Sequence, residues 1–144
     1  MSISVKFFVA PDDTSAGLVL QTGPGRAFES LSFRNFDSED AVVEWECLLA
    51  DGSVEELVEA GEPRIVAGQD NDGCVVFAMS PRLSAVLADA GHSRLRDIAA
   101  VWAQLRAEGD EAIDTEIAGA IVSNLADLVS SARRQNQSVY CWVA

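Results

Sequence analysis

Histidine and cysteine are scarce in this sequence, and their scarcity excludes several kinds of site. His92 is the only histidine, and no serine or cysteine nearby is placed to act with it as a nucleophile, so we interpret it as a surface residue. Cys47, Cys74 and Cys141 are far apart and form no CxxC pair. That spacing does not suit zinc or a disulfide framework and favours small buried side chains. We therefore predict no catalytic residue, no metal site and no cofactor.

Long apolar runs are also missing. Hydrophobic residues make up 49% of the 144 residues, enough for a core. No run approaches the roughly 18 residues that span a bilayer. The first nine residues hold Lys6 and a short apolar stretch, and Asp12 and Asp13 follow soon after, which differs from a secretory signal. We expect one globular domain over residues 1–144, located in the cytoplasm.

Basic residues are scarce as well. Lys6 is the only lysine, and ten basic residues stand against 23 acidic ones, for a net charge of −13. Residues 37–72 hold twelve acids and one base, Arg64, whereas residues 1–36 are neutral and residues 73–144 carry a net charge of −2. Because this acidic segment repels phosphates, we expect the protein to bind neither nucleic acid nor an anionic membrane.

Two short segments share features with ligand-binding loops but lack most of the residues that such loops use. Thr22-Gly23-Pro24-Gly25-Arg26 contains a GxG, yet it has no lysine for a phosphate, and Pro24 offers no N–H. Gln69-Asp70-Asn71-Asp72-Gly73 lacks the alternating acids and the distal glutamate of a calcium loop. We interpret both segments as turns.

Periodicity predicts a mixture of strands and helices. Strands are expected where apolar residues alternate or run continuously, at residues 3–9, 27–33, 65–66, 74–79 and 139–143. Helices are expected where capping residues precede 3–4 spacing, at residues 12–20, 37–50, 53–58, 80–91, 93–105 and 114–132. Because both faces of the last strand are apolar, we place it inside the sheet. The predicted fold is α+β, with a sheet of about three to five strands that includes both terminal strands, covered by about five helices.

Three of the predicted helices have an apolar stripe and a cap. In the first, Asp37 is the N-cap and Glu44 and Glu46 flank a stripe of Ala41, Trp45, Leu48 and Leu49. In the second, Ser93 is the cap before a stripe of Leu95, Ile98, Trp102 and Leu105. In the third, Asp114 is the cap, and the stripe consists of Ile117, Ile121, Leu125, Leu128 and Ala132.

The layout of these segments resembles the YfbM-like family of small bacterial proteins, which has no assigned function. The likeness rests on the opening strand Val5 to Pro11, the acid-led helix Asp40 to Leu49, the Ser80-Pro81 helix start and the tail Ala132 to Val143. This resemblance implies a fold rather than an activity.

One departure from that family concerns the acid-led helix. Histidines are frequent in this helix of the family, whereas residues 40–50 here contain none and offer Val43, Glu44 and Glu46 instead. If those histidines catalyse a reaction in the family, this chain lacks the residues for that reaction.

The acidic segment is the strongest functional feature. It is either a solvated face that keeps the protein soluble or a docking surface for a basic protein, as in immunity proteins and antitoxins. The hypothetical surface consists of Asp37, Glu39, Asp40, Glu44 and Glu46. Reversing several charges among the last four of these is expected to leave the fold intact.

Two other functions remain open. The first is a small-ligand module whose cleft is lined by Trp45, Trp102 and Trp142 under an acidic rim, although tryptophans at these positions are more typical of a core. The second, which has the least support, is an enzyme with two carboxylates converging in a closed cleft.

Overall fold

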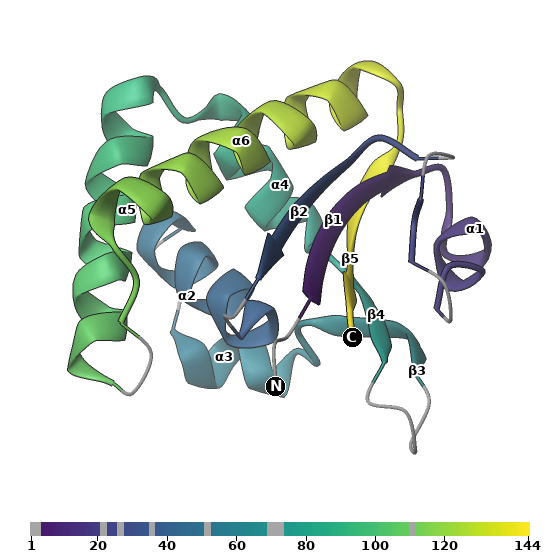
Figure 1. The fold of residues 1–144 in the computed structure, drawn as a ribbon, viewed down its shortest axis with the longest axis horizontal. Coiled ribbons are helices and arrows are strands. Elements are labelled where there is room, and N and C mark those ends of the chain that lie inside the picture. Colours follow the sequence, from purple (N-terminus) through teal and green to yellow (C-terminus); the bar gives the residue numbers. More distant parts are fainter. Residues whose placement is uncertain are drawn as a thin grey trace.

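The structure, a computed structural model, describes residues 4–20, 23–25, 28–34, 37–50, 53–68, 74–109 and 112–144. Its strands are β1 (Ser4–Ala10), β2 (Ser30–Arg34), β3 (Arg64–Gly68), β4 (Val75–Ala78) and β5 (Ser138–Val143). Its helices are α1 (Asp13–Gly17), α2 (Ser38–Ala50), α3 (Val54–Glu59), α4 (Pro81–Asp89), α5 (His92–Glu108) and α6 (Thr115–Arg134). These elements confirm the predicted α+β fold (Figure 1).

The five strands form one antiparallel sheet in the order β2-β1-β5-β4-β3. The C-terminal strand is therefore central, as predicted from its two apolar faces. Cys141 of β5 lies between Phe7 of β1 and Phe77 of β4, and this row points to one face of the sheet. Tyr140 lies between Phe8 and Ala78 in the neighbouring row, which points to the other face.

The two faces of the sheet have unequal covers. Helices α2, α4, α5 and α6 pack on the face that carries Phe7 and Phe77, and they bury the larger core with it (Figure 1). The other face is covered by α1 and the turn that follows it, where Ala16 and Val19 pack near Phe8. The helices thus form a thick layer on one side only.

Two expected core residues lie at the surface instead. Leu105 near the end of α5 is 42% exposed, and Ile117 near the start of α6 is 57% exposed. Helices α5 and α6 form an antiparallel hairpin whose joined end extends beyond the sheet (Figure 1). None of the described strands lies under that end, so the stripes are buried only closer to the sheet.

Most predicted helix caps are confirmed. The side chains of Asp12, Ser53, Ser80 and Asp114 each accept a hydrogen bond from a backbone N–H of the first turn that follows. The expected cap at Ser93 is wrong: α5 begins at His92, and its N-cap is Gly91, which has no side chain to bond. The helix therefore begins two residues earlier than a cap at Ser93 would place it, and its first residue, His92, is exposed.

Of the two predicted turns, only the first lies partly within the described residues. Gly23 and Gly25 have φ angles of 80° and 57°, which confirms the turn there. The predicted turn at residues 69–73 lies outside the described residues.

Polar contacts attach α1 to the sheet. The Tyr140 hydroxyl donates to Asp13 Oδ1 at 2.8 Å, and the Arg64 guanidinium donates to both oxygens of the same carboxylate. Trp142 Nε1 donates to the Leu20 carbonyl at 2.8 Å, just beyond α1. Burial and the bond to Asp13 raise the pKa of Tyr140 to about 12.

Alkaline pH is expected to weaken this attachment through Tyr140. A tyrosine in an unfolded chain ionises near pH 10, so the higher folded pKa stabilises the fold below about pH 10, and this contribution is lost as the pH rises towards 12. Tyr140→Phe should lower the free energy of unfolding by about 1 kcal/mol at neutral pH and should reduce the loss between pH 10 and 12. Urea denaturation across this range measures both effects.

The sequence offers a direct control for that experiment. Tyr140 is the only tyrosine, so phenolate absorbance reports its ionisation alone. An absorbance midpoint near pH 10 in the folded protein would contradict the expected protection.

Candidate functional site

Acidic side chains and a few apolar ones line a groove of about 390 Å³ beside α2 and α3. We call this the acidic groove. Its lining consists of Glu39, Asp40, Val43, Glu44, Val58, Glu62 and Pro63. Four of these residues carry carboxylates, and the other three are apolar. The groove therefore combines negative charge with apolar surface.

The first turns of α2 place three of these carboxylates on one face. The predicted N-cap at Asp37 is confirmed, because its Oδ1 accepts a hydrogen bond from the Asp40 N–H at 3.1 Å. Residues three and four positions apart lie on the same helix face, so Asp40 is beside Val43 and Glu44. Asp37 itself is exposed and is not part of the groove lining.

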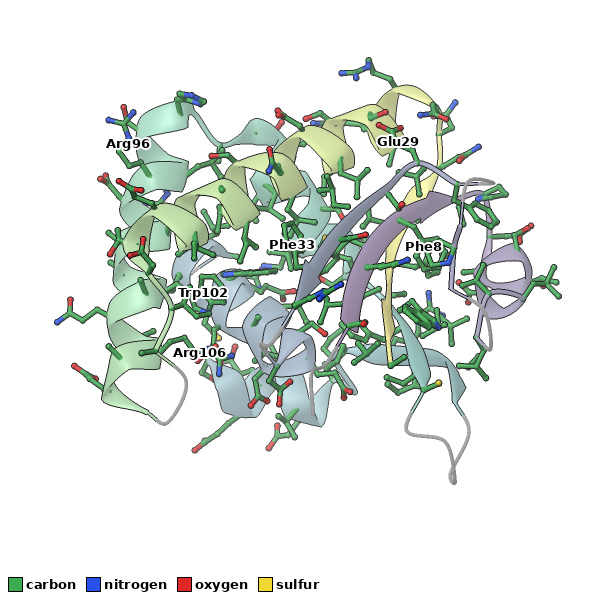
Figure 2. The ribbon with its side chains drawn as sticks, in the orientation of Figure 1. Phe8, Glu29, Phe33, Arg96, Trp102 and Arg106 are labelled. Carbon is green, nitrogen blue, oxygen red and sulfur yellow. The ribbon has the colours of Figure 1, made fainter. Side chains whose placement is uncertain are left out.

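Glu44 has a structural partner on α5. Its Oε1 lies 2.6 Å from an Arg106 guanidinium nitrogen and accepts a hydrogen bond from Trp102 Nε1 at 3.2 Å. Both partners extend from α5 towards α2 (Figure 2). The charge of Glu44 is thus compensated inside the protein, and this residue forms a fixed wall of the groove.

The C-terminal end of α2 is also held by neighbouring helices. Its last turn contains no basic residue of its own. Instead, Arg82 of α4 donates to the Ala50 carbonyl, and Arg94 of α5 donates to the Leu49 carbonyl at 3.4 Å. Cations at this end satisfy terminal carbonyls and complement the helix dipole. The groove therefore rests on a helix that is fixed along its length.

Glu46 does not belong to the surface, which corrects the sequence prediction. It is 4% exposed and accepts a hydrogen bond from the hydroxyl of Ser80, the N-cap of α4. Its spacing explains the burial: Val42, Trp45, Glu46 and Leu49 share the 3–4 pattern of one buried face. Glu46 therefore joins α2 to α4 and is out of reach of a partner protein.

Glu62 is the groove residue that the sequence prediction missed. It follows α3, and α3 packs against α2, which brings Glu62 to the acids of the first α2 turns. The helix predicted at residues 53–58 is α3 itself. No local signal distinguishes Glu62 from the other acids of the segment, because its position depends on how α3 packs.

Two carboxyl groups of the groove titrate at higher pH than usual. Burial raises the pKa of Glu39, and the charges of Asp37 and Asp40 raise it further. Burial and the charge of Glu46 raise the pKa of Glu62, and Arg64 opposes this shift. Negative charge at these two positions is therefore disfavoured by the protein's own surroundings.

Glu46 and Glu62 also line a second, much smaller cavity, together with Ser80. Two converging carboxylates are what an acid–base enzyme would require. The volume of this cavity is only about 10 Å³, however, which is room for at most one water molecule. A substrate does not fit between these carboxyl groups.

The interpretation of the tryptophans as core residues is confirmed. Trp45, Trp102 and Trp142 are 1%, 0% and 9% exposed. Trp45 and Trp102 contact each other edge to face, with ring centroids 5.0 Å apart. None of the three lines the acidic groove, so this groove is not the tryptophan-lined cleft considered from the sequence.

The cysteines follow their predicted role only in part. Cys141 is buried at 1% exposure, and burial raises the pKa of its thiol. Cys47 and Cys74 are half-buried, and none of the three cysteines forms a disulfide within the described residues. Within the described part of the chain, no three His, Cys, Asp or Glu side chains cluster closely enough to hold a metal ion.

No helix among the described residues is both long enough and apolar enough to cross a membrane. No family model, no curated protein and no solved structure matches the chain.

Proposed function

We propose that the protein is an interaction domain whose acidic groove docks a lysine or arginine side chain of a basic partner protein. The methylene groups of such a side chain would lie along Val43, Val58 and Pro63, and its charge would lie among the carboxylates. Val58 is 62% exposed, so part of this apolar surface is available for contact.

The convergence of four carboxylates and three apolar side chains on one groove is the observation that carries this proposal, and the raised pKa values of Glu39 and Glu62 support it. Each of these carboxylates is partly buried beside other negative charges. A cation from a partner would relieve that repulsion, and its own desolvation would be compensated by several carboxylates at once. Perturbed titration in a concave site is typical of functional positions.

The acidity around the groove supports the same role. Residues 37–72 carry a net charge of −11, and this count includes the exposed Glu55, Glu56 and Glu59 of α3 near the groove. Such a field accelerates association with a basic surface and disfavours acidic competitors. A protein that covers the basic surface of a toxin, as an immunity protein or antitoxin does, would use this arrangement.

Affinity capture from the native cell lysate at low and high salt tests the proposal. The groove variant is Glu39→Gln with Asp40→Asn and Glu62→Gln. The matched control is Asp97→Asn with Glu108→Gln and Asp127→Asn, which changes the net charge equally at exposed positions on α5 and α6, outside the groove lining. The native protein should capture a stoichiometric partner that dissociates in high salt.

We expect the groove variant to bind this partner roughly 100-fold more weakly, because three charge pairs of about 1 kcal/mol each are removed. The control variant should bind within about threefold of the native protein. The groove variant should differ in stability from the native protein by no more than about 0.5 kcal/mol, because the relief of repulsion offsets the loss of two carboxylates at the start of α2. Equal capture by the native protein and the groove variant would overturn the proposal.

A further inference from the structure

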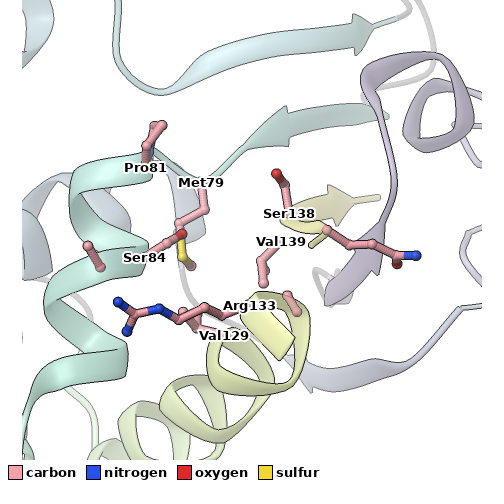
Figure 3. A pocket seen from close by; sticks show the side chains of 10 residues that line it. Met79, Pro81, Ser84, Val129, Arg133, Ser138 and Val139 are labelled. Carbon is pink, nitrogen blue, oxygen red and sulfur yellow. The ribbon is translucent and has the colours of Figure 1, made fainter. Parts of the chain in front are cut away.

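A second cavity, of about 260 Å³, lies where α4 and α6 diverge from the sheet (Figure 3). The β4–β5 ladder ends with the Met79 N–H donating to the Val139 carbonyl at 3.0 Å, and the chain then turns into α4. Helix α6 arrives from the opposite side and ends in a turn in which the Gln137 N–H donates to the Ala132 carbonyl at 2.9 Å. The two helices leave Ser138, the first residue of β5, exposed between them.

The inner wall of this cavity is apolar. Met79, Val129 and Val139 are 4%, 3% and 2% exposed, and Ala132 lies beside them. Because the cavity is half-open and its wall is made of core side chains, an apolar group could replace water there without moving the fold. Its volume is below that of the pockets that hold drug-sized molecules, so it suits a smaller ligand.

Polar groups occur mainly towards the mouth of the cavity. Ser84 and Ser138 contribute hydroxyls, and the Ser84 side chain points towards Met79 (Figure 3). Neither hydroxyl forms a hydrogen bond with another residue that the structure describes. A hydroxyl both donates and accepts, so these two serines could bond a neutral polar group of a ligand.

The charges at the mouth cancel each other. Arg133 lines the cavity, and its guanidinium lies 2.8 Å from the Asp89 carboxylate. An anion would have to compete with Asp89 for this arginine, and a cation would meet the arginine itself. The local charge therefore favours a neutral ligand over either ion.

We propose that this cavity binds a small neutral amphiphile, with a short apolar chain that ends in one hydroxyl or carbonyl group. The chain packs against Met79, Val129 and Val139, and the polar end bonds to Ser84 and Ser138. The site lies on α4, α6 and β5, so it shares no lining residue with the acidic groove.

Titration of the full chain with hexan-1-ol, followed by amide NMR shifts, tests this site. Hexanoate and hexylammonium are the matched anionic and cationic probes. We expect saturable shifts confined to the start of α4, the end of α6 and Ser138–Val139, and at least roughly tenfold weaker binding of both ions. Absence of saturable shifts with hexan-1-ol, or tighter binding of either ion, would overturn the proposal.

Substitutions at Ser84 distinguish the cavity from general surface adsorption. Ser84→Met fills the cavity and should abolish the shifts, whereas Ser84→Ala keeps the space and should weaken binding about fivefold through the lost hydrogen bond. Ser123→Met is the control, because Ser123 is also half-buried on a helix but lies outside the cavity lining. If Ser84→Met fails to fold, Ala85→Met at the exposed rim provides a second blocking variant. Unchanged binding in a folded blocking variant contradicts the assignment.

Discussion

Glu46→Lys is expected to destabilise the protein by about 3–5 kcal/mol, because it leaves an uncompensated charge in the interior. Glu46 is 4% exposed, and its carboxyl group accepts the hydrogen bond of Ser80. A lysine ammonium offers no acceptor for that hydroxyl. It would also lie near the N-terminal end of α4, where a positive charge is unfavourable.

Chemical denaturation followed by circular dichroism measures this effect. Glu46→Gln retains an acceptor for Ser80 and should cost clearly less than the lysine substitution, about 1–2 kcal/mol. Asp40→Lys is the control, because Asp40 lies on the same helix but is exposed, and it should change stability by only about 0.5–1 kcal/mol through the helix dipole. Equal losses for Glu46→Lys and Asp40→Lys would show that Glu46 is solvated after all.

The difference between buried Glu46 and exposed Asp40 revises the expectation that several α2 charges can be reversed together with the fold intact. Glu39 and Asp40 lie in the first turn and have no described role in the core. Glu44 bonds Trp102 and Arg106, and Glu46 bonds Ser80. Reversal is therefore expected to be tolerated at the first pair and to destabilise the fold at the second.

The spacing of apolar residues in the sequence indicates that Glu46 is buried, although the prediction places this residue at the surface. Val42, Trp45 and Leu49 stand at the spacing of a helix face, and Glu46 falls within that face. The predicted stripe of Ala41, Trp45, Leu48 and Leu49 is buried or half-buried, but the buried face is wider and extends through Val42 to Glu46. A carboxylate inside an apolar stripe indicates a buried partner, which here is Ser80.

The central position of β5 follows from its own two apolar faces, so its sequence was sufficient to predict it. Three other features depend on tertiary structure and have no local signal in the sequence. The exposure of Ile117 and Leu105 depends on where the sheet ends under the α5–α6 hairpin. Glu62 enters the acidic groove only because α3 packs against α2, and the periodicity of either helix alone does not specify that contact.

The acidic groove and the core beneath it are joined through one aromatic residue. Trp102 is fully buried, its ring contacts Trp45, and its indole N–H bonds Glu44 in the groove wall. The guanidinium carbon of Arg106 lies 6.0 Å from the centroid of the same ring. Trp102 thus supports both the α2–α5 packing and the position of a groove carboxylate.

Trp102→Ala is expected to lower the free energy of unfolding by about 3–5 kcal/mol, since it removes a large buried side chain and leaves a cavity. Trp102→Phe keeps an aromatic ring but removes the N–H donated to Glu44, so we expect a smaller loss, about 1–2 kcal/mol. Val101→Ala is the control, because Val101 is the neighbouring residue and is 43% exposed; its cost should be about 0.5 kcal/mol or less.

Urea denaturation of the three variants, followed by circular dichroism, measures these differences. A Trp102→Ala variant that is no less stable than Val101→Ala would contradict the packing of α2 on α5. Binding of the proposed basic partner would separate the two roles of this residue. The phenylalanine variant should retain most of the affinity, because Arg106 still holds Glu44 in place at 2.6 Å when the indole bond is lost.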